Sequence, residues 1–283
     1  MSGRRGDHLG RSASLRFSGA LCLSLLGLSA LGCGGQAPGE LKPEERQELR
    51  VEVAELLIQA RSYDEAAPIL RAALSRSPRD PRLHMLLGVT LRDKGVYREA
   101  ERSLREAIKL QPLLAEAQGE LGVLLSLTGR HELAIQAHQR SIELNDQVAR
   151  SHNNLGFSYA LMGQHELAIT AFERALRLAP TDKRVYVNLG FSLGALKRDE
   201  EARRMLSQAL SSAEVWHNLG LIYLKRGERG AAEIAYQRAL DEDPRLSLAR
   251  EALQALRAQG APAPSRQAPP PPELPSAPKS KTP

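Results

Sequence analysis

Residues 213–246 read AEVWHNLGLIYLKRGERGAAEIAYQRALDEDPRL, and this stretch decides the fold of the chain. Its bulky Trp216 is followed by a Leu-Gly pair, an alanine twelve residues after that glycine, a second alanine seven residues further on, and Pro244. Residues 149–182 repeat the same order of residue types. Self-similarity at a period of 34 residues indicates a stack of helix-turn-helix units, in which each unit covers the apolar face of the next.

The period can be followed through six units. Position 8 is small in every unit, and position 20 is always alanine. Small residues at two facing positions let antiparallel helices approach closely, so we expect the two helices of each unit to touch there. The units are 47–80, 81–114, 115–148, 149–182, 183–212 and 213–246, and their position-8 residues are Ala54, Gly88, Gly122, Gly156, Gly190 and Gly220.

This pattern resembles the tetratricopeptide repeat, whose W-x₂-L-G-x₂-Y order, followed by spaced A, F, A and P, is met nearly letter for letter at 149–182 and 213–246. The resemblance implies an all-α fold, a right-handed α-solenoid of six helix-turn-helix units. Residues 247–258 are amphipathic, and we expect them to form a C-terminal capping helix. The side chains expected on its buried stripe are Leu248, Ala252, Leu253 and Leu256.

Two units depart from the pattern. Unit 183–212 is four residues short, lacks the inter-unit turn with its proline, and is followed by a capping box that begins at Ser211. The deletion is either a tolerated loop change or a change in stacking angle that shapes a binding surface. In the first unit Arg61 stands where four of the other units have the turn glycine, and Pro68 falls in the second helix. We expect this unit to be an irregular cap.

The N-terminus carries a separate signal. Four arginines precede an uncharged stretch at 17–32, which is too short for a comfortable membrane span and ends at Cys33. This arrangement resembles a bacterial lipoprotein signal, although Ala30 and Leu31 depart from the common residues before the cysteine. The resemblance implies a signal peptide at 1–32, a covalent lipid on Cys33 and a tether at 33–46. An ordinary secreted protein and an uncleaved anchor are the alternatives.

The C-terminus and the charge distribution narrow the class of protein further. Residues 259–283 are rich in proline and predict a disordered tail, either a solvated spacer or a PxxP ligand. The net charge of +6 is concentrated in the signal peptide and this tail, so the repeats are close to neutral. A near-neutral surface with interspersed arginine and glutamate does not favour nucleic acid as a partner.

The sequence shows no constellation of catalytic residues. His131 and His165 occupy the same position in neighbouring units, but no third residue with metal-ligand spacing accompanies them. The chain has no Gly-x-Ser-x-Gly motif and no phosphate-binding glycine loop followed by lysine. We therefore expect a protein that is not an enzyme and has no cofactor, no metal and no small-molecule substrate.

In the family that the chain resembles, the first helices of the units line a concave groove that holds a partner segment. Phe157 and Phe191 fall at the same repeat position and should lie in line in this groove, unless their rings pack inward. The asparagines at position 6 would bind a peptide backbone or satisfy local backbone groups. The predicted groove residues are Met85, Val89, Val123, Leu127, Asn154, Phe157, Leu161, Asn188, Phe191, Asn218, Leu221 and Leu224.

Six repeats behind a lipoprotein signal resemble the outer-membrane pilotins of type IV pili and proteins of the tight-adherence pilus system. The resemblance implies a scaffold or assembly factor that faces the periplasm, is lipid-anchored in the bacterial outer membrane, and binds a protein or peptide during pilus or secretin assembly. A second hypothesis is a periplasmic adaptor that regulates peptidoglycan enzymes. A remote third is an enzyme or a metal-binding protein.

Overall fold

The computed structural model describes residues 42–260. Contacts divide the chain into two compact units, 1–46 and 47–283, and all six repeats lie in the second. The signal peptide, Cys33 and the proline-rich tail therefore lie outside the described residues, together with most of the first unit.

The described residues form α-helices and short connections, without a strand among them. Six antiparallel helix pairs are followed by a thirteenth helix, which confirms the all-α fold, the six units and the capping helix. The helices are α1 (Pro43–Gln59), α2 (Tyr63–Arg76), α3 (Pro81–Asp93), α4 (Tyr97–Leu110), α5 (Ala115–Leu127), α6 (His131–Leu144), α7 (Ala149–Leu161), α8 (His165–Leu178), α9 (Lys183–Ala195), α10 (Asp199–Leu206), α11 (Ser212–Lys225), α12 (Arg229–Glu242) and α13 (Ser247–Gly260).

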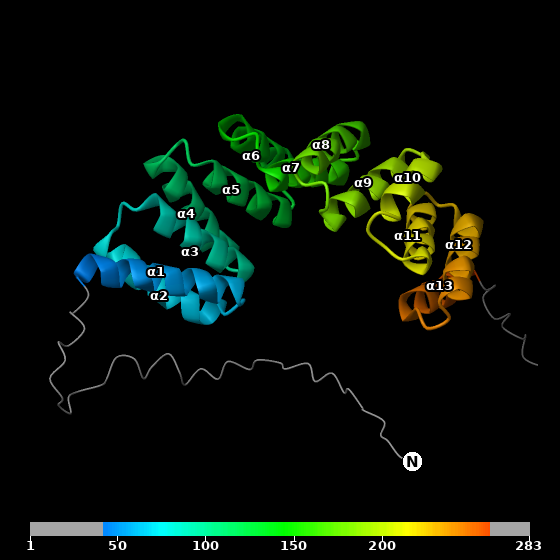
Figure 1. Ribbon diagram of the computed structural model, residues 1–283, viewed down its shortest axis with the longest axis horizontal. Coiled ribbons are helices and arrows are strands. Elements are labelled where there is room, and N and C mark those ends of the chain that lie inside the picture. The colour runs from blue at the N-terminus through cyan, green and yellow to red at the C-terminus, as the bar shows by residue number, and fades with distance from the viewer. Residues whose placement is uncertain (1–41, 261–283) are drawn as a thin grey trace, which may run out of the picture. The chain divides into compact units, whose positions relative to one another are not determined.

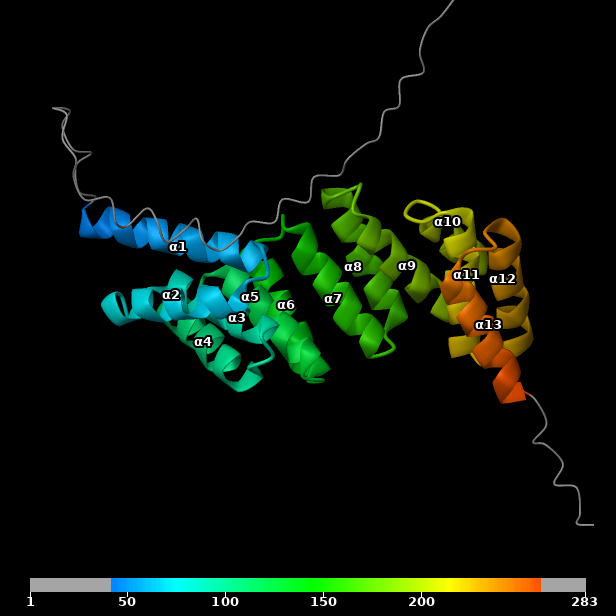
Figure 2. The same ribbon diagram turned by 90° about the horizontal axis from the view of Figure 1, so that it is seen from below.

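Within the second unit, the helix pairs follow one another in chain order along a curved row (Figure 1). The first helices α3, α5, α7, α9 and α11 line its inner side, and the second helices α4 to α12 lie outside them. Each of these first helices contacts the next first helix, and Figure 2 shows α7, α9 and α11 side by side. The inner surface is therefore built from first helices, as the repeat pattern predicts.

Inside the second to sixth pairs, a large side chain at position 24 packs onto the glycine at position 8. A Cβ atom added to Gly156 would lie 2.7 Å from the ring of Phe172, and one added to Gly88 would lie 2.6 Å from Leu104. Both side chains at position 24 are fully buried. Because no side chain fits between these groups, only glycine lets the helices approach this closely. The predicted close contact is confirmed.

The turn between the two helices requires a left-handed backbone. Gly95, Gly129, Gly163 and Gly227 adopt φ values between 71° and 80° at position 15. Arg61 and Lys197 occupy the same position in the first and fifth units and also have positive φ, at 60° and 61°. Their Cβ atoms make this conformation costly for them.

The fifth unit is shortened in its second helix. Helix α10 has 8 residues, whereas α8 and α12 have 14 each. The deletion therefore falls in the helix, because residues 207–211 still form a turn between α10 and α11. The sequence interpretation, which expected the inter-unit turn to be missing, was wrong on this point. The capping box is confirmed: the Ser211 hydroxyl accepts the Glu214 N–H at 3.4 Å, and the Glu214 carboxylate accepts the Ser211 N–H at 2.8 Å.

The apolar core is interrupted between the third and fourth units. One cluster of buried apolar side chains ends at Ala137, and the next begins at Ala168. Hydroxyl pairs lie at the intervening seam, with Ser126 and Ser158 3.0 Å apart and the buried Ser141 and Ser151 3.2 Å apart. This seam is thus held by hydrogen bonds where its neighbours are held by apolar packing.

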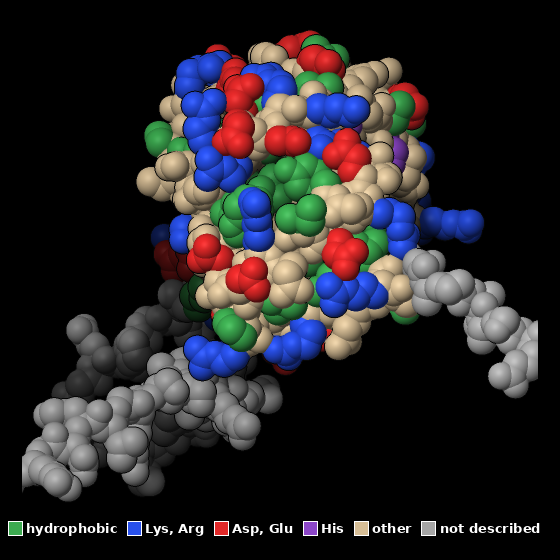
Figure 3. Space-filling model, turned by 90° about the vertical axis from the view of Figure 1, so that its right-hand side faces the viewer, with side chains coloured by type: hydrophobic (Ala, Val, Ile, Leu, Met, Phe, Trp, Pro, Cys, Tyr) green, Lys and Arg blue, Asp and Glu red, His purple; other side chains and the backbone are tan. Residues whose placement is uncertain are grey.

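Helix α13 covers the last repeat in the register of a further first helix. Ala249, Leu253 and Leu256 are buried, whereas Leu248, which was expected on this stripe, is 59% exposed. The expected stripe is confirmed for Leu253 and Leu256, and Ala252 is half-buried, but it was wrong for Leu248 because the three buried side chains keep the repeat positions 3, 7 and 10. Figure 3 faces this end of the unit and shows hydrophobic side chains gathered there among charged ones.

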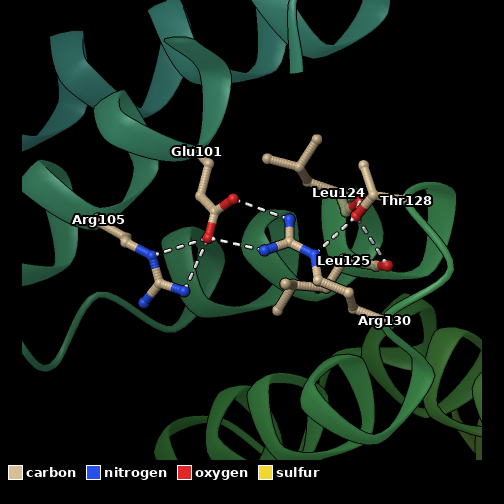
Figure 4. A network of polar contacts seen from close by, with 6 residues as sticks. All are labelled: Glu101, Arg105, Leu124, Leu125, Thr128 and Arg130. Atoms are coloured by element: carbon tan, nitrogen blue, oxygen red, sulfur yellow. Dashed lines mark hydrogen bonds and ion pairs between the residues drawn. The ribbon is translucent and has the colours of Figure 1, made fainter. Parts of the chain in front are cut away.

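Ion pairs link neighbouring units on the outer side. The guanidinium group of Arg130, at the turn before α6, donates to both oxygens of Glu101 on α4, at 2.8 and 3.2 Å (Figure 4). Arg130 also donates to the Thr128 hydroxyl, and Arg105 binds the same carboxylate. The hydrogen bonds from Arg130 lower the pKa of the Glu101 carboxyl group. The network fixes the third unit against the second.

Candidate groove on the inner face

The predicted groove residues lie on the first helices but differ in exposure. Leu127, Phe157, Leu161, Leu221 and Leu224 are exposed. The other side chains are half-buried, and Met85 among them packs against the core cluster of the first three units. The half-buried members are Met85, Val89, Val123, Asn154, Asn188, Phe191 and Asn218.

A cavity of about 450 Å³ opens between α7, α9 and α11. Of the predicted residues, it brings together Phe157, Leu161, Asn188 and Phe191. The remaining predicted residues do not line it. Its volume lies in the range of natural ligand pockets, which are mostly apolar with a few polar groups.

Several residues that line the cavity were not predicted. Val187, Ala160, Ala195 and Lys225 stand at positions 5, 12 and 13, which belong to the groove set of the repeat family, so the register alone could have identified them. Phe172 and Ile222 are buried core residues that also reach the cavity wall. Their contribution depends on side-chain packing that the register does not specify.

The two phenylalanines of the groove have different environments. Phe157 is 46% exposed, with its ring beside the cavity. Phe191 is half-buried and packs against the core cluster that contains Leu189 and Phe172. The ring of Phe191 therefore packs partly inward, whereas Phe157 presents its ring to the groove.

The asparagine amides donate to groups of the chain itself. The Asn188 amide donates to the side-chain oxygen of Asn153 at 3.0 Å, and the Asn218 amide donates to the backbone oxygen of Glu214 at 2.8 Å. These two amides therefore bind groups of their own chain. Their side-chain oxygens accept no hydrogen bond from any residue in the described range.

Charge around the cavity is uneven. Its lining contains His165, Lys225 and Arg226 but no carboxylate among the described residues. Arg226 is neutralised by Asp199 at 2.5 Å and by Glu228, whereas Lys225 is exposed and forms no ion pair with any residue between 42 and 260. Burial lowers the pKa of His165, and the positive charge of Lys225 lowers it further. Lys225 therefore contributes an unpaired positive charge to the lining among the described residues.

The arginines at repeat position 2 are already paired. Arg150 donates to the buried carboxylate of Glu120, and Arg184 donates to Asp182 at 2.9 Å. Both guanidinium groups therefore already have a carboxylate partner within the chain.

The histidines have structural contacts. Nε2 of His84 lies 2.9 Å from the backbone oxygen of Pro78, and Nε2 of His152 lies 2.9 Å from that of Asp146. Each contact ties the start of a first helix to the preceding turn. Among residues 42–260 no three histidine, cysteine or carboxylate side chains are grouped as metal ligands would be. Nor does any helix of this range have the length and apolarity needed to cross a membrane.

Comparisons with known proteins identify the repeat. Models of the tetratricopeptide repeat match residues 57–112, 113–181, 147–214 and 213–246, and together they span most of the chain. A search of curated proteins found no sequence relative.

Solved structures share the fold. A structure of the MamA protein is 25% identical over 65% of this chain and 96% of its own, with a TM-score of 0.50. PilF of Pseudomonas aeruginosa is 19% identical over 76% of this chain and 98% of its own, with a TM-score of 0.60. YrrB, described as having an unusual peptide-binding site, is 18% identical over 65% of this chain and 97% of its own, with a TM-score of 0.52.

Proposed function

Because the chain belongs to the tetratricopeptide repeat family, whose stacked helix pairs bind protein segments, we propose that it is a non-enzymatic scaffold that holds an apolar segment of a partner protein between α7, α9 and α11. The observation that carries this proposal is the ring of Phe157, 46% exposed beside a cavity with mainly apolar walls. Leaving a large aromatic ring in water forgoes burial free energy that a bound partner recovers.

The cavity suits one or two anchor side chains of a helix or an extended segment. Phe157 and Leu161 are one helical turn apart on α7, so both can contact the same anchor. Buried aromatic anchors carry much of the binding free energy in such complexes. Lys225 would pair with a carboxylate that flanks the anchor, and would contribute more to orientation than to affinity.

The cellular setting is a further part of the proposal. A lipid on Cys33 would hold the repeats on the periplasmic side of the bacterial outer membrane through the 33–46 tether. A role in pilus or secretin assembly is supported by the resemblance to pilotins and by the shared fold with PilF of Pseudomonas aeruginosa. An adaptor for peptidoglycan enzymes is the alternative, and it would use the same groove.

Site-specific photo-crosslinking tests the groove directly. A photoreactive residue replaces Leu161 in the cavity or, as control, the comparably exposed Leu167 on the outer helix α8. We expect the Leu161 derivative to capture one partner segment in living cells and the Leu167 derivative to capture none of it. Capture of the same segment at equal yield from both positions would reject the groove as the binding site.

A further inference from the structure

Helix α1 leaves bare a face that is covered in every later unit. Positions 3, 7 and 10 of each first helix, which we term the stacking positions, contact the preceding unit. In α1 they are Leu49, Val53 and Leu56, which are 48%, 36% and 63% exposed. These three side chains lie along one stripe of the helix, because residues three and four apart share a face.

The same positions are covered elsewhere. Position 3 and position 10 are buried in all five later units and in α13, and position 7 is buried in all of them except the fourth unit, where Leu155 is half-buried. The second helices of the pairs cover these positions, because each second helix, from α2 to α12, contacts the first helix that follows it. The sequence interpretation expected the first unit to be a cap, but its outer stripe is apolar.

Ion pairs between successive first helices lie on the groove side of the stripe. Among the described residues, α1 has no preceding first helix with which to form such a pair. Glu55 on α1 binds Arg82 on α3 at 2.6 Å, Arg92 on α3 binds Glu120 on α5, and Glu120 binds Arg150 on α7. In each pair, a side chain at position 2 or 6 meets an opposite charge on the preceding first helix.

Glu48 and Glu52 stand at these two positions in α1. Both are exposed, and neither forms an ion pair with a residue between 42 and 260. A helix with positive charges along one edge would supply the partners that these two glutamates do not have among the described residues.

We propose that α1 is a docking face for an amphipathic helix of a partner protein. That helix carries apolar side chains three and four residues apart and has lysine or arginine along the edge that faces Glu48 and Glu52. It takes the place that a preceding repeat would have, and so extends the stack by one helix. Another copy of α1 fits less well, because it brings its own glutamates and a like-charged pair opposes association.

Two matched synthetic helices test the surface. Both are alanine-based with leucines that match the stripe, and they differ only in having lysine or glutamate along one edge. Fluorescence anisotropy measures their binding to the full chain. We expect the lysine peptide to bind at least about tenfold more tightly than the glutamate peptide. This preference should vanish in Glu48→Gln/Glu52→Gln.

Variants of exposed leucines supply the controls. Leu49→Glu/Leu56→Glu should abolish binding of the lysine peptide, whereas Leu133→Glu/Leu167→Glu, at comparably exposed leucines of α6 and α8, should retain it. Phe157→Ala should retain it as well, which separates this face from the groove. Circular dichroism establishes that each variant is folded.

Equal binding of the two peptides would overturn the proposal, as would undiminished binding to Leu49→Glu/Leu56→Glu. Sedimentation velocity provides a further decisive outcome. A dimer that Leu49→Glu/Leu56→Glu converts to a monomer would show that a second copy covers the stripe, and would reject a partner helix as its occupant.

Discussion

His138 stands at repeat position 24, where the other repeats have leucine, phenylalanine or tyrosine. Its ring packs onto Gly122 and is 1% exposed, next to the interruption of the apolar core. Burial lowers the pKa of His138 to about 4, although the nearby carboxylate of Glu120 acts in the opposite direction. Arg150 on α7 also lowers it.

This histidine makes the folded state sensitive to acid. Its pKa is lower in the folded than in the unfolded chain, so folded protein binds fewer protons and loses stability as the pH falls from about 6.5 towards 4. The loss by pH 5 is on the order of 2 kcal/mol. His138→Leu should reduce the difference in melting temperature between pH 7 and pH 5, because leucine already fills this position against Gly88 and Gly190.

A reciprocal variant is the control. Leu104→His places a histidine at the same position of the second unit, where it should introduce acid sensitivity of its own. If His138→Leu keeps the full pH dependence of the wild type, the acid sensitivity originates in other groups.

The turn of the fifth unit gives a prediction about an element. Lys197 adopts φ 61° where four other units have glycine, and it forms no ion pair with a described residue. Lys197→Gly should therefore raise the free energy of unfolding by about 1 kcal/mol, measured by chemical denaturation. Lys197→Ala should give no comparable gain because the Cβ atom remains. A loss of stability in Lys197→Gly would contradict the left-handed turn.

Elements of the repeat could be predicted from the sequence because each rests on a backbone requirement. The glycine at position 8 and the turn glycine at position 15 are fixed by close approach and by φ, which residue type reveals directly. The shortening of α10 could not be placed, since a deletion does not say whether helix or turn absorbs it. The apolar stripe of α1 could also have been recognised from the sequence, because its repeat positions are the ones that α13 buries.

The groove was predictable only in part for a physical reason. Repeat position states which side of a helix a residue occupies, and so placed Phe157 and Phe191 on the inner side. How deeply each ring is buried depends on the neighbouring side chains. Phe191 shares space with the core of the fourth to sixth units, whereas Phe157 does not.

At the scale of the whole molecule, the anchor is a separate prediction. Cys33→Ser should move the protein from the membrane to the soluble fraction after cell fractionation, because the acyl chain would be lost. Cys22 lies in the stretch that processing would remove, so Cys22→Ser should leave the protein in the membrane fraction. Mass spectrometry of the wild type should find lipid on Cys33. Sedimentation of Cys33→Ser with the membrane would reject a lipid anchor at this residue.

The inner face between α7, α9 and α11 is the proposed binding surface for a partner. The most direct measurement is the affinity, by isothermal titration calorimetry, of the segment that crosslinks at Leu161, for the wild type and for Phe157→Ala. We predict a loss of about 2 kcal/mol or more in binding free energy with an unchanged melting temperature, because the exposed ring of Phe157 would be an anchor for the partner. Leu167→Ala should bind as the wild type does. Unchanged affinity in Phe157→Ala would contradict the account.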